Sequence, residues 1–127
     1  MLSLARRTVA LCAFALATAP AASAQVADPD PARFAETLAR FAAWDRQNSF
    51  PERAVLFVGS SSIAGWPTAD RFPGLPVINR GIGGSQISDF NHFIEPTVLK
   101  YAPDVVVVYA GNNDVEAGKS PRQVLED

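Results

Sequence analysis

Three short runs of apolar residues, each ended by a loop of glycine and polar residues, constrain the fold of this chain more than any other feature. The runs span residues 54–58, 76–79 and 105–109, and the loops after them span residues 59–62, 81–84 and 111–114. Their hydrophobicity is continuous, which is typical of strands buried on both faces of a parallel sheet. Residues 86–95 and 97–102 carry a helical pattern interrupted at Pro96. This alternation predicts an α/β fold, in which ligands bind beyond the carboxyl ends of the strands.

The first 24 residues have the pattern of a secretory signal peptide. Two arginines give a basic start, residues 8–19 are apolar and uncharged, and an Ala-Ser-Ala cleavage site stands at residues 22–24. An uncleaved anchor helix is the alternative, but a membrane span needs about 20 apolar residues and this run is shorter. We therefore expect cleavage after Ala24, a mature chain that begins at Gln25, and a secreted or periplasmic location without a stable membrane anchor.

The composition of the mature chain excludes several kinds of site and partner. The only cysteine, Cys12, lies in the signal peptide, so the mature chain has no disulfide and no thiolate metal site. The formal charge is −2 for the whole sequence, and loss of the two arginines makes the mature chain more acidic. Such a chain has no basic footprint for nucleic acid. We therefore expect neither a nucleic-acid partner nor a membrane-surface helix.

Residues 25–53 are expected to form a polar lead-in and one amphipathic helix, ahead of a domain that spans residues 54–127. Asp30 followed by Pro31 is typical of an N-cap and the first residue of a helix. Apolar side chains then recur at three- and four-residue spacing, at Phe34, Leu38, Phe41 and Trp44. This pattern predicts a helix that ends near residues 48–51 and packs its aromatic stripe against the core.

Ser61 is the first candidate for chemistry at the edge of the sheet. It follows a predicted buried strand and precedes a short helical turn, so its hydroxyl is expected to be exposed and its N–H to point from a helix start. A nucleophile needs that exposure, and an acyl oxyanion needs such an N–H. Serines at 60–62 are equally typical of turns and helix caps, which leaves a purely structural role open. The second glycine of G-x-S-x-G is missing, which argues against the α/β-hydrolase type.

The second and third loops supply candidate hydrogen-bond donors. Residues 79–84 do not make the dinucleotide motif G-x-G-x-x-G, because Gln86 stands where its third glycine would be. The loop backbone can still approach a ligand closely, with the N–H of Gly84 free to donate, although such glycines also serve turn geometry alone. Asn113 follows the third run with a carboxamide that can donate to an oxyanion, although asparagine is common in turns.

Together the three loops resemble the sequence blocks of the SGNH (GDSL-like) hydrolase family, and residues 54–125 carry the resemblance. The segment around Ser61 is similar to the first block, usually G-D-S. Ser60 stands in the place of the aspartate, and Ser61 falls on the nucleophile. The other two blocks match Gly84, as the glycine whose N–H helps to form the oxyanion hole, and Asn113, as the oxyanion asparagine of G-x-N-D.

The resemblance implies a flavodoxin-like three-layer sandwich with a parallel sheet, present here as about its first half with three strands. With half a sheet, we expect the last strand, residues 105–109, to present an unpaired hydrophobic edge and to cause low solubility or self-association. It also implies ester hydrolysis through an acyl-enzyme, with no metal and no organic cofactor. The partner would be a small-molecule or carbohydrate ester. The ester itself and the oligomeric state are not specified by the sequence.

The catalytic acid and base of the family form an Asp-x-x-His pair, which is expected beyond Asp127. The only histidine of the sequence is His92, and Asp89 gives it the same D-x-x-H spacing. His92 lies eight residues past Gly84, which on a helix is roughly 12 Å from that loop, so we expect it to be non-catalytic and able to pair with Asp89. We expect the chain to be truncated before its base and to be a weak or inactive esterase. A non-catalytic carbohydrate- or ligand-binding domain and a non-functional fragment are the alternatives.

Overall fold

A computed structural model gives the structure of the protein and describes residues 25–127. The predicted signal peptide lies outside the described residues. In chain order the elements are η1 (Pro31–Phe34), α1 (Ala35–Gln47), β1 (Val55–Gly59), α2 (Ser61–Ala64), α3 (Thr68–Arg71), β2 (Val77–Gly81), α4 (Ile87–Thr97), η2 (Leu99–Tyr101), β3 (Val105–Tyr109), α5 (Asn112–Glu116) and α6 (Pro121–Glu126), where η marks a 3₁₀ helix.

The sheet has three parallel strands in the order β2-β1-β3. Val55 of β1 is level with Val77 of β2 and with Val105 of β3, so the three strands run in register over their whole length. The predicted α/β class and the three parallel strands are therefore confirmed. Each connection between the strands contains helices, as parallel strands require.

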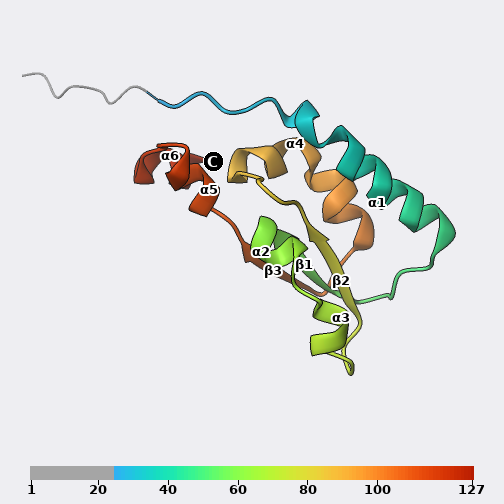
Figure 1. The fold of residues 1–127 in the computed structure, drawn as a ribbon. Coiled ribbons are helices and arrows are strands. Elements are labelled where there is room, and N and C mark those ends of the chain that lie inside the picture. Colours follow the sequence, from blue (N-terminus) through green and yellow to red (C-terminus); the bar gives the residue numbers. More distant parts are fainter. Residues whose placement is uncertain (1–24) are drawn as a thin grey trace, which may run out of the picture.

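Helices cover both faces of the sheet, because alternate side chains of a strand point to opposite faces. Leu56 and Val58 of β1 belong to a buried cluster with Tyr101 on the α4 side. Phe57 points the other way and stacks on Phe72, with 5.5 Å between the ring centroids, on the side of α2 and α3. Figure 1 shows α1 and α4 next to each other on one side of the sheet. The layers are those of an incomplete flavodoxin-like sandwich.

The predicted amphipathic helix is present as η1 and α1. The Asp30 side chain caps its start by accepting a hydrogen bond from the N–H of Ala32 at 2.9 Å. Phe34 is buried, but Trp44 near the other end is 46% exposed. The ring of Trp44 lies over the guanidinium of Arg80, 5.2 Å from its centroid, and so packs on a cation rather than within an apolar core.

The predicted interruption at Pro96 is displaced along the chain. Pro96 lies inside α4, and the non-helical residue is Phe93, with φ −125° and ψ 25°. A proline ring clashes with the carbonyl four residues earlier, and proline has no N–H to donate to it. The distortion therefore falls one turn before Pro96, which sits in the first turn after the kink.

The burial of the third strand on both faces, which its apolar run favours, is wrong, whereas the expected unpaired hydrophobic edge at this strand is confirmed. Val106 and Val108 are 41% and 65% exposed, because β3 is an edge strand and no described element covers its far side. Together with Val58 and residues of α4, these valines line an apolar groove of about 320 Å³. The strand therefore has the hydrophobic side chains of a central strand at an open edge.

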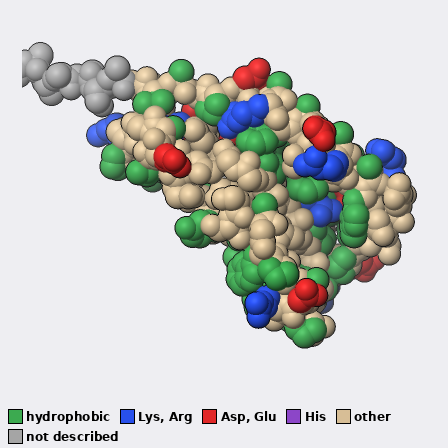
Figure 2. All heavy atoms as spheres, viewed as in Figure 1, with side chains coloured by type: hydrophobic (Ala, Val, Ile, Leu, Met, Phe, Trp, Pro, Cys, Tyr) green, Lys and Arg blue, Asp and Glu red, His purple; other side chains and the backbone are tan. Residues whose placement is uncertain are grey.

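Charged side chains are dispersed over the face drawn in Figure 2, where Asp and Glu lie among the Lys and Arg side chains. That face has no concentrated basic patch of the kind that binds nucleic acid. Among residues 25–127, no helix has both the length and the apolar character that crossing a bilayer requires.

Candidate active site

The three predicted site residues follow the ends of the three strands. Gly59 at the end of β1 is level with Gly81 of β2 and with Tyr109 of β3, so all three strands end at one edge of the sheet. Ser61, Gly84 and Asn113 lie within four residues of these ends. This is the edge at which ligands bind in open parallel sheets.

Ser61 and Ser60 have different surroundings, although both residues are equally typical of turns and helix caps and only the family resemblance distinguishes them. Ser60 is fully buried, its N–H donates to the carbonyl of Tyr109 at 3.0 Å, and its hydroxyl donates to Oδ1 of Asn112 at 3.2 Å. Ser61 is the first residue of α2 and is exposed. Ser60 thus ties β1 to the loop after β3, which leaves Ser61 as the accessible hydroxyl next to it.

Two glycines allow α2 to sit close to the ends of the other strands. A Cβ on Gly59, whose φ is +143°, would lie 2.0 Å from the carbonyl oxygen of Tyr109. A Cβ on Gly81 would lie 2.3 Å from the backbone nitrogen of Ala64 in α2. Real side chains do not fit at such distances, so the placement of Ser61 depends on glycine at both positions.

The Gly84 loop lies beside Ser61. A Cβ on the neighbouring Gly83 would be 4.0 Å from the Cβ of Ser61, which is van der Waals contact. Gly84 itself is exposed, with a φ of +78° that favours glycine. Within residues 25–127, neither the Ser61 N–H nor the Gly84 N–H donates to a protein oxygen. An oxyanion site requires backbone donors of this kind close to the nucleophile.

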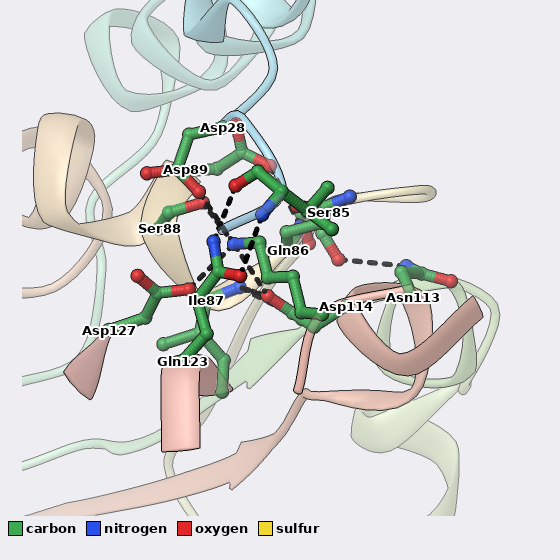
Figure 3. A network of polar contacts seen from close by, with 12 residues as sticks. Asp28, Ser85, Gln86, Ile87, Ser88, Asp89, Asn113, Asp114, Gln123 and Asp127 are labelled. Carbon is green, nitrogen blue, oxygen red and sulfur yellow. Dashed lines mark hydrogen bonds and ion pairs between the residues drawn. The ribbon is translucent and has the colours of Figure 1, made fainter. Parts of the chain in front are cut away.

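Asn113 is attached to the same loop from the other side. Its Nδ2 donates to the carbonyl of Ser85 at 2.7 Å, a contact that Figure 3 shows. A carboxamide NH₂ carries two hydrogens, so one remains for a ligand. The structure therefore brings the Gly84 loop close to Ser61 at Gly83, and into hydrogen-bond contact with Asn113 at Ser85.

The sequence analysis missed the polar network behind Asn113. Asp114 is completely buried, and both of its carboxylate oxygens lie 3.2 Å from the N–H of Ile87, at the start of α4. The side chain of Lys119 is also buried and donates to Asp114 at 3.2 Å. An N-D pair in a loop indicates only a turn, and nothing near Lys119 in the sequence marks it as a core residue.

His92 and Asp89 do not form the pair that their spacing suggested. Asp89 is 1% exposed, accepts a hydrogen bond from Arg33 at 2.5 Å and another from the N–H of Gln86 at 2.7 Å. It therefore caps α4 and fastens the lead-in helix to it. His92 is exposed on α4, and no hydrogen bond joins it to Asp89 or to Ser61 within residues 25–127.

Comparison with known proteins finds solved structures with a similar fold, but no match to a sequence family. No protein-family model matches the chain, and no curated protein matches it by sequence. A protein from Streptococcus pneumoniae described as a platelet activating factor superposes with a TM-score of 0.62 at 21% identity, over 72% of this chain and 43% of its own.

Two further solved structures align over similar lengths. A GDSL-like lipase from Bacteroides thetaiotaomicron has a TM-score of 0.55 at 29% identity, over 65% of this chain and 43% of its own. An acylhydrolase from Bacteroides fragilis has a TM-score of 0.54 at 27% identity, over 73% of this chain and 46% of its own. The chain thus spans less than half the length of each of the three structures.

Proposed function

We propose that this chain, which has an SGNH (GDSL-like) hydrolase-like fold over the part it shares with these structures, holds the nucleophile and the oxyanion donors of a serine ester hydrolase. The closeness of the Gly83–Gly84 backbone to Ser61 carries this proposal, because it brings two backbone N–H groups, unpaired within residues 25–127, to the region of an exposed hydroxyl. The Asn113 carboxamide, held against Ser85, supplies the third donor. The likeness to a GDSL-like lipase and an acylhydrolase supports the same chemistry.

In the proposed reaction, Oγ of Ser61 attacks the ester carbonyl carbon. The carbonyl oxygen becomes an oxyanion that accepts hydrogen bonds from the N–H groups of Ser61 and Gly84 and from Nδ2 of Asn113. The oxyanion then re-forms the carbonyl, and the bond between the carbonyl carbon and the alcohol oxygen breaks. The Ser61 hydroxyl gives up its proton to solvent, and the alcohol takes up one proton as it leaves. The acyl group stays on Ser61 until water hydrolyses it. The substrate class is a small-molecule or carbohydrate ester, and we propose that the protein meets it outside the cytoplasm, after export.

We assign no base to the reaction. His92 is the only imidazole of the sequence, and it lies exposed on α4 without a contact to Ser61. An unassisted serine hydroxyl is a weak nucleophile near neutral pH. In triad hydrolases that lose a triad member, the oxyanion hole and substrate binding still give about 10³- to 10⁴-fold catalysis over water. We therefore expect the chain to turn over activated esters slowly, at a rate set by its oxyanion donors.

Turnover of p-nitrophenyl acetate tests the proposal. We expect the purified chain to exceed the buffer rate, and Ser61→Ala and Asn113→Ala to lower that excess by about tenfold or more. Ser62→Ala is the matched control for the nucleophile, because Ser62 is an exposed serine in the same helix. His92→Ala should match the unmodified chain.

Two results would contradict these assignments. Equal turnover by the unmodified chain and Ser61→Ala would favour the non-catalytic ligand-binding alternative. Turnover that disappears in His92→Ala would show that His92 is the base after all.

A further inference from the structure

Lys119 is a buried lysine, whereas the side chain of Lys100, the other lysine of residues 25–127, is 31% exposed. The Lys119 side chain is fully buried, and its ammonium group contacts four oxygens. These are Oγ of Ser88 at 3.0 Å, Oδ1 of Asp114 at 3.2 Å, Oδ2 of Asp127 at 2.6 Å and Oδ1 of Asp28 at 2.7 Å. A buried ammonium is costly unless it is paired and hydrogen-bonded, so the cation holds these partners in place.

The four partners come from parts of the chain that are far apart in sequence. Asp28 belongs to the lead-in, Ser88 to the first turn of α4, Asp114 to α5, and Asp127 follows α6. Figure 3 shows the labelled partners converging on one point. Gln123 of α6 adds a second attachment of the lead-in, since its side chain bonds both the N–H and the carbonyl of Val26. Lys119 is thus a junction of four segments behind the candidate active site.

Asp114 connects this junction to the oxyanion donors. Its carboxylate accepts from the N–H of Ile87, three residues after Gly84. The adjacent Asn113 holds the carbonyl of Ser85 in the same loop. Two consecutive residues of α5 therefore hold the loop just after Gly84. The distance between the Gly84 N–H and the Asn113 carboxamide thus depends on the position of Asp114.

Charge gives Lys119 a second role. A buried, unpaired carboxylate one residue from Asn113 would repel a developing oxyanion, because charges are weakly screened where water is excluded. Burial by itself would lower the pKa of Lys119, but hydrogen bonds to Asp127, Asp28 and Asp114 raise it well above its ordinary value. Lys119 therefore stays charged throughout the neutral range and offsets the charge of Asp114.

We propose that Lys119 is a positioning residue for ester hydrolysis, which neutralises Asp114 and thereby fixes the spacing of the Gly84 and Asn113 oxyanion donors. This inference rests on the proposed function. It predicts that loss of the ammonium group frees the Asp114 carboxylate, releases the Ile87 N–H and separates the two donors, without changing the residues that contact the substrate.

The first test does not depend on catalysis. In Lys119→Met we expect the amide signals of Gly84 and of the Asn113 side chain to shift or broaden in ¹⁵N NMR spectra, and the Ile87 amide to exchange with solvent about tenfold faster or more. Lys100→Met is the matched control, because Lys100, in η2 beyond the C-terminal end of α4, is also ion-paired, with Asp45 of α1. Signals at Gly84, Asn113 and Ile87 that change no more in Lys119→Met than in Lys100→Met would overturn the proposal.

The double variant Asp114→Asn/Lys119→Met covers the case in which Lys119→Met does not fold. Neutralising both fully buried members of the cluster is commonly tolerated, whereas removing Lys119 alone leaves a fully buried unpaired charge on Asp114. Asp28 and Asp127 keep their charges, but they are 46% and 14% exposed and so retain contact with water. We expect the double variant to fold and to keep the Gly84 and Asn113 signals closer to their original positions than Lys119→Met does. A double variant that folds but perturbs both signals as strongly as Lys119→Met would overturn the role of charge neutralisation.

Kinetics supply the readout that a purely structural role would not give. For p-nitrophenyl acetate we expect Lys119→Met to lower kcat by about 10- to 100-fold with KM changed less than about twofold, since donors displaced by about 1 Å act mainly on the transition state. The double variant should recover most of that loss. A loss confined to KM, or none, would overturn the proposal. If the unmodified chain is no faster than Ser61→Ala, the proposed function fails, and the NMR comparison still decides whether Lys119 positions the loop.

Discussion

Replacing Gly81 with alanine tests whether the position of the nucleophile depends on close packing between β2 and α2. The new Cβ would lie 2.3 Å from the backbone nitrogen of Ala64 and 2.7 Å from the carbonyl carbon of Ile63. Non-bonded carbon atoms pack best at about 3.5–4.0 Å, so α2 has to move by roughly 1 Å. The φ of Gly81 is not positive, so the effect comes from contact and not from backbone strain.

The magnitude follows from that displacement. Overpacking of this kind costs about 1–3 kcal/mol of unfolding free energy. A shift of about 1 Å in a reacting group lowers turnover by about 10²-fold. Urea unfolding followed by tryptophan fluorescence measures the first effect, and p-nitrophenyl acetate turnover measures the second.

Gly74→Ala is the matched control, because a Cβ on Gly74 would meet no atom within 4 Å. We expect this control to stay within about 0.5 kcal/mol of the unmodified chain. If Gly81→Ala unfolds at the same urea concentration as Gly74→Ala and keeps its turnover, the packing argument for Ser61 is wrong.

Three further predictions concern pH, association and processing. Burial would raise the pKa of Asp45, but its hydrogen bonds lower this pKa overall. The Asp45 carboxylate therefore stabilises the folded state above about pH 4, and this contribution is lost as pH falls through the folded-state pKa. In urea titrations, Asp45→Asn should reduce the loss of stability in acid. Val108 and Val115 are both 65% exposed, but only Val108 lies on the open edge strand, so Val108→Lys should raise the monomer fraction in sedimentation and Val115→Lys should not. Exported protein should begin at Gln25 by intact mass, and a mature protein that keeps Met1 would refute cleavage.

The strands of the sheet were predictable because buried strands appear in a sequence as continuous apolar runs. The run from Val105 to Tyr109 forms β3 with the predicted boundaries, since five consecutive β-formers leave little choice of structure. The apolar run alone did not predict the exposure of that strand, but the expected half sheet did, because it leaves its last strand at an unpaired hydrophobic edge. An apolar run shows that a strand can be covered on both faces, but the covering element is a property of the whole fold. The kink at Phe93 was missed for a simpler reason, since a proline acts on the carbonyl one turn before it.

The site was predictable only in outline. The loops after parallel strands meet at one edge, which places Ser61, Gly84 and Asn113 together in any fold of this class. The family resemblance indicated Ser61 rather than Ser60, but the position of Ser60 depends on a hydrogen bond to Asn112, 52 residues away, which no local pattern encodes. Lys119 was missed for the same reason.

The most direct test of the central claim is to locate the acyl group after reaction with p-nitrophenyl acetate. The chain is incubated with the ester, quenched in acid and digested, and its acetylated peptides are identified by mass spectrometry. Our account predicts acetyl on Ser61 in the unmodified chain and in Ser62→Ala, no acetyl on buried Ser60, and slower accumulation in Asn113→Ala. Acetyl on Ser62 with Ser61 unmodified, or equal rates in Asn113→Ala and the unmodified chain, would contradict it.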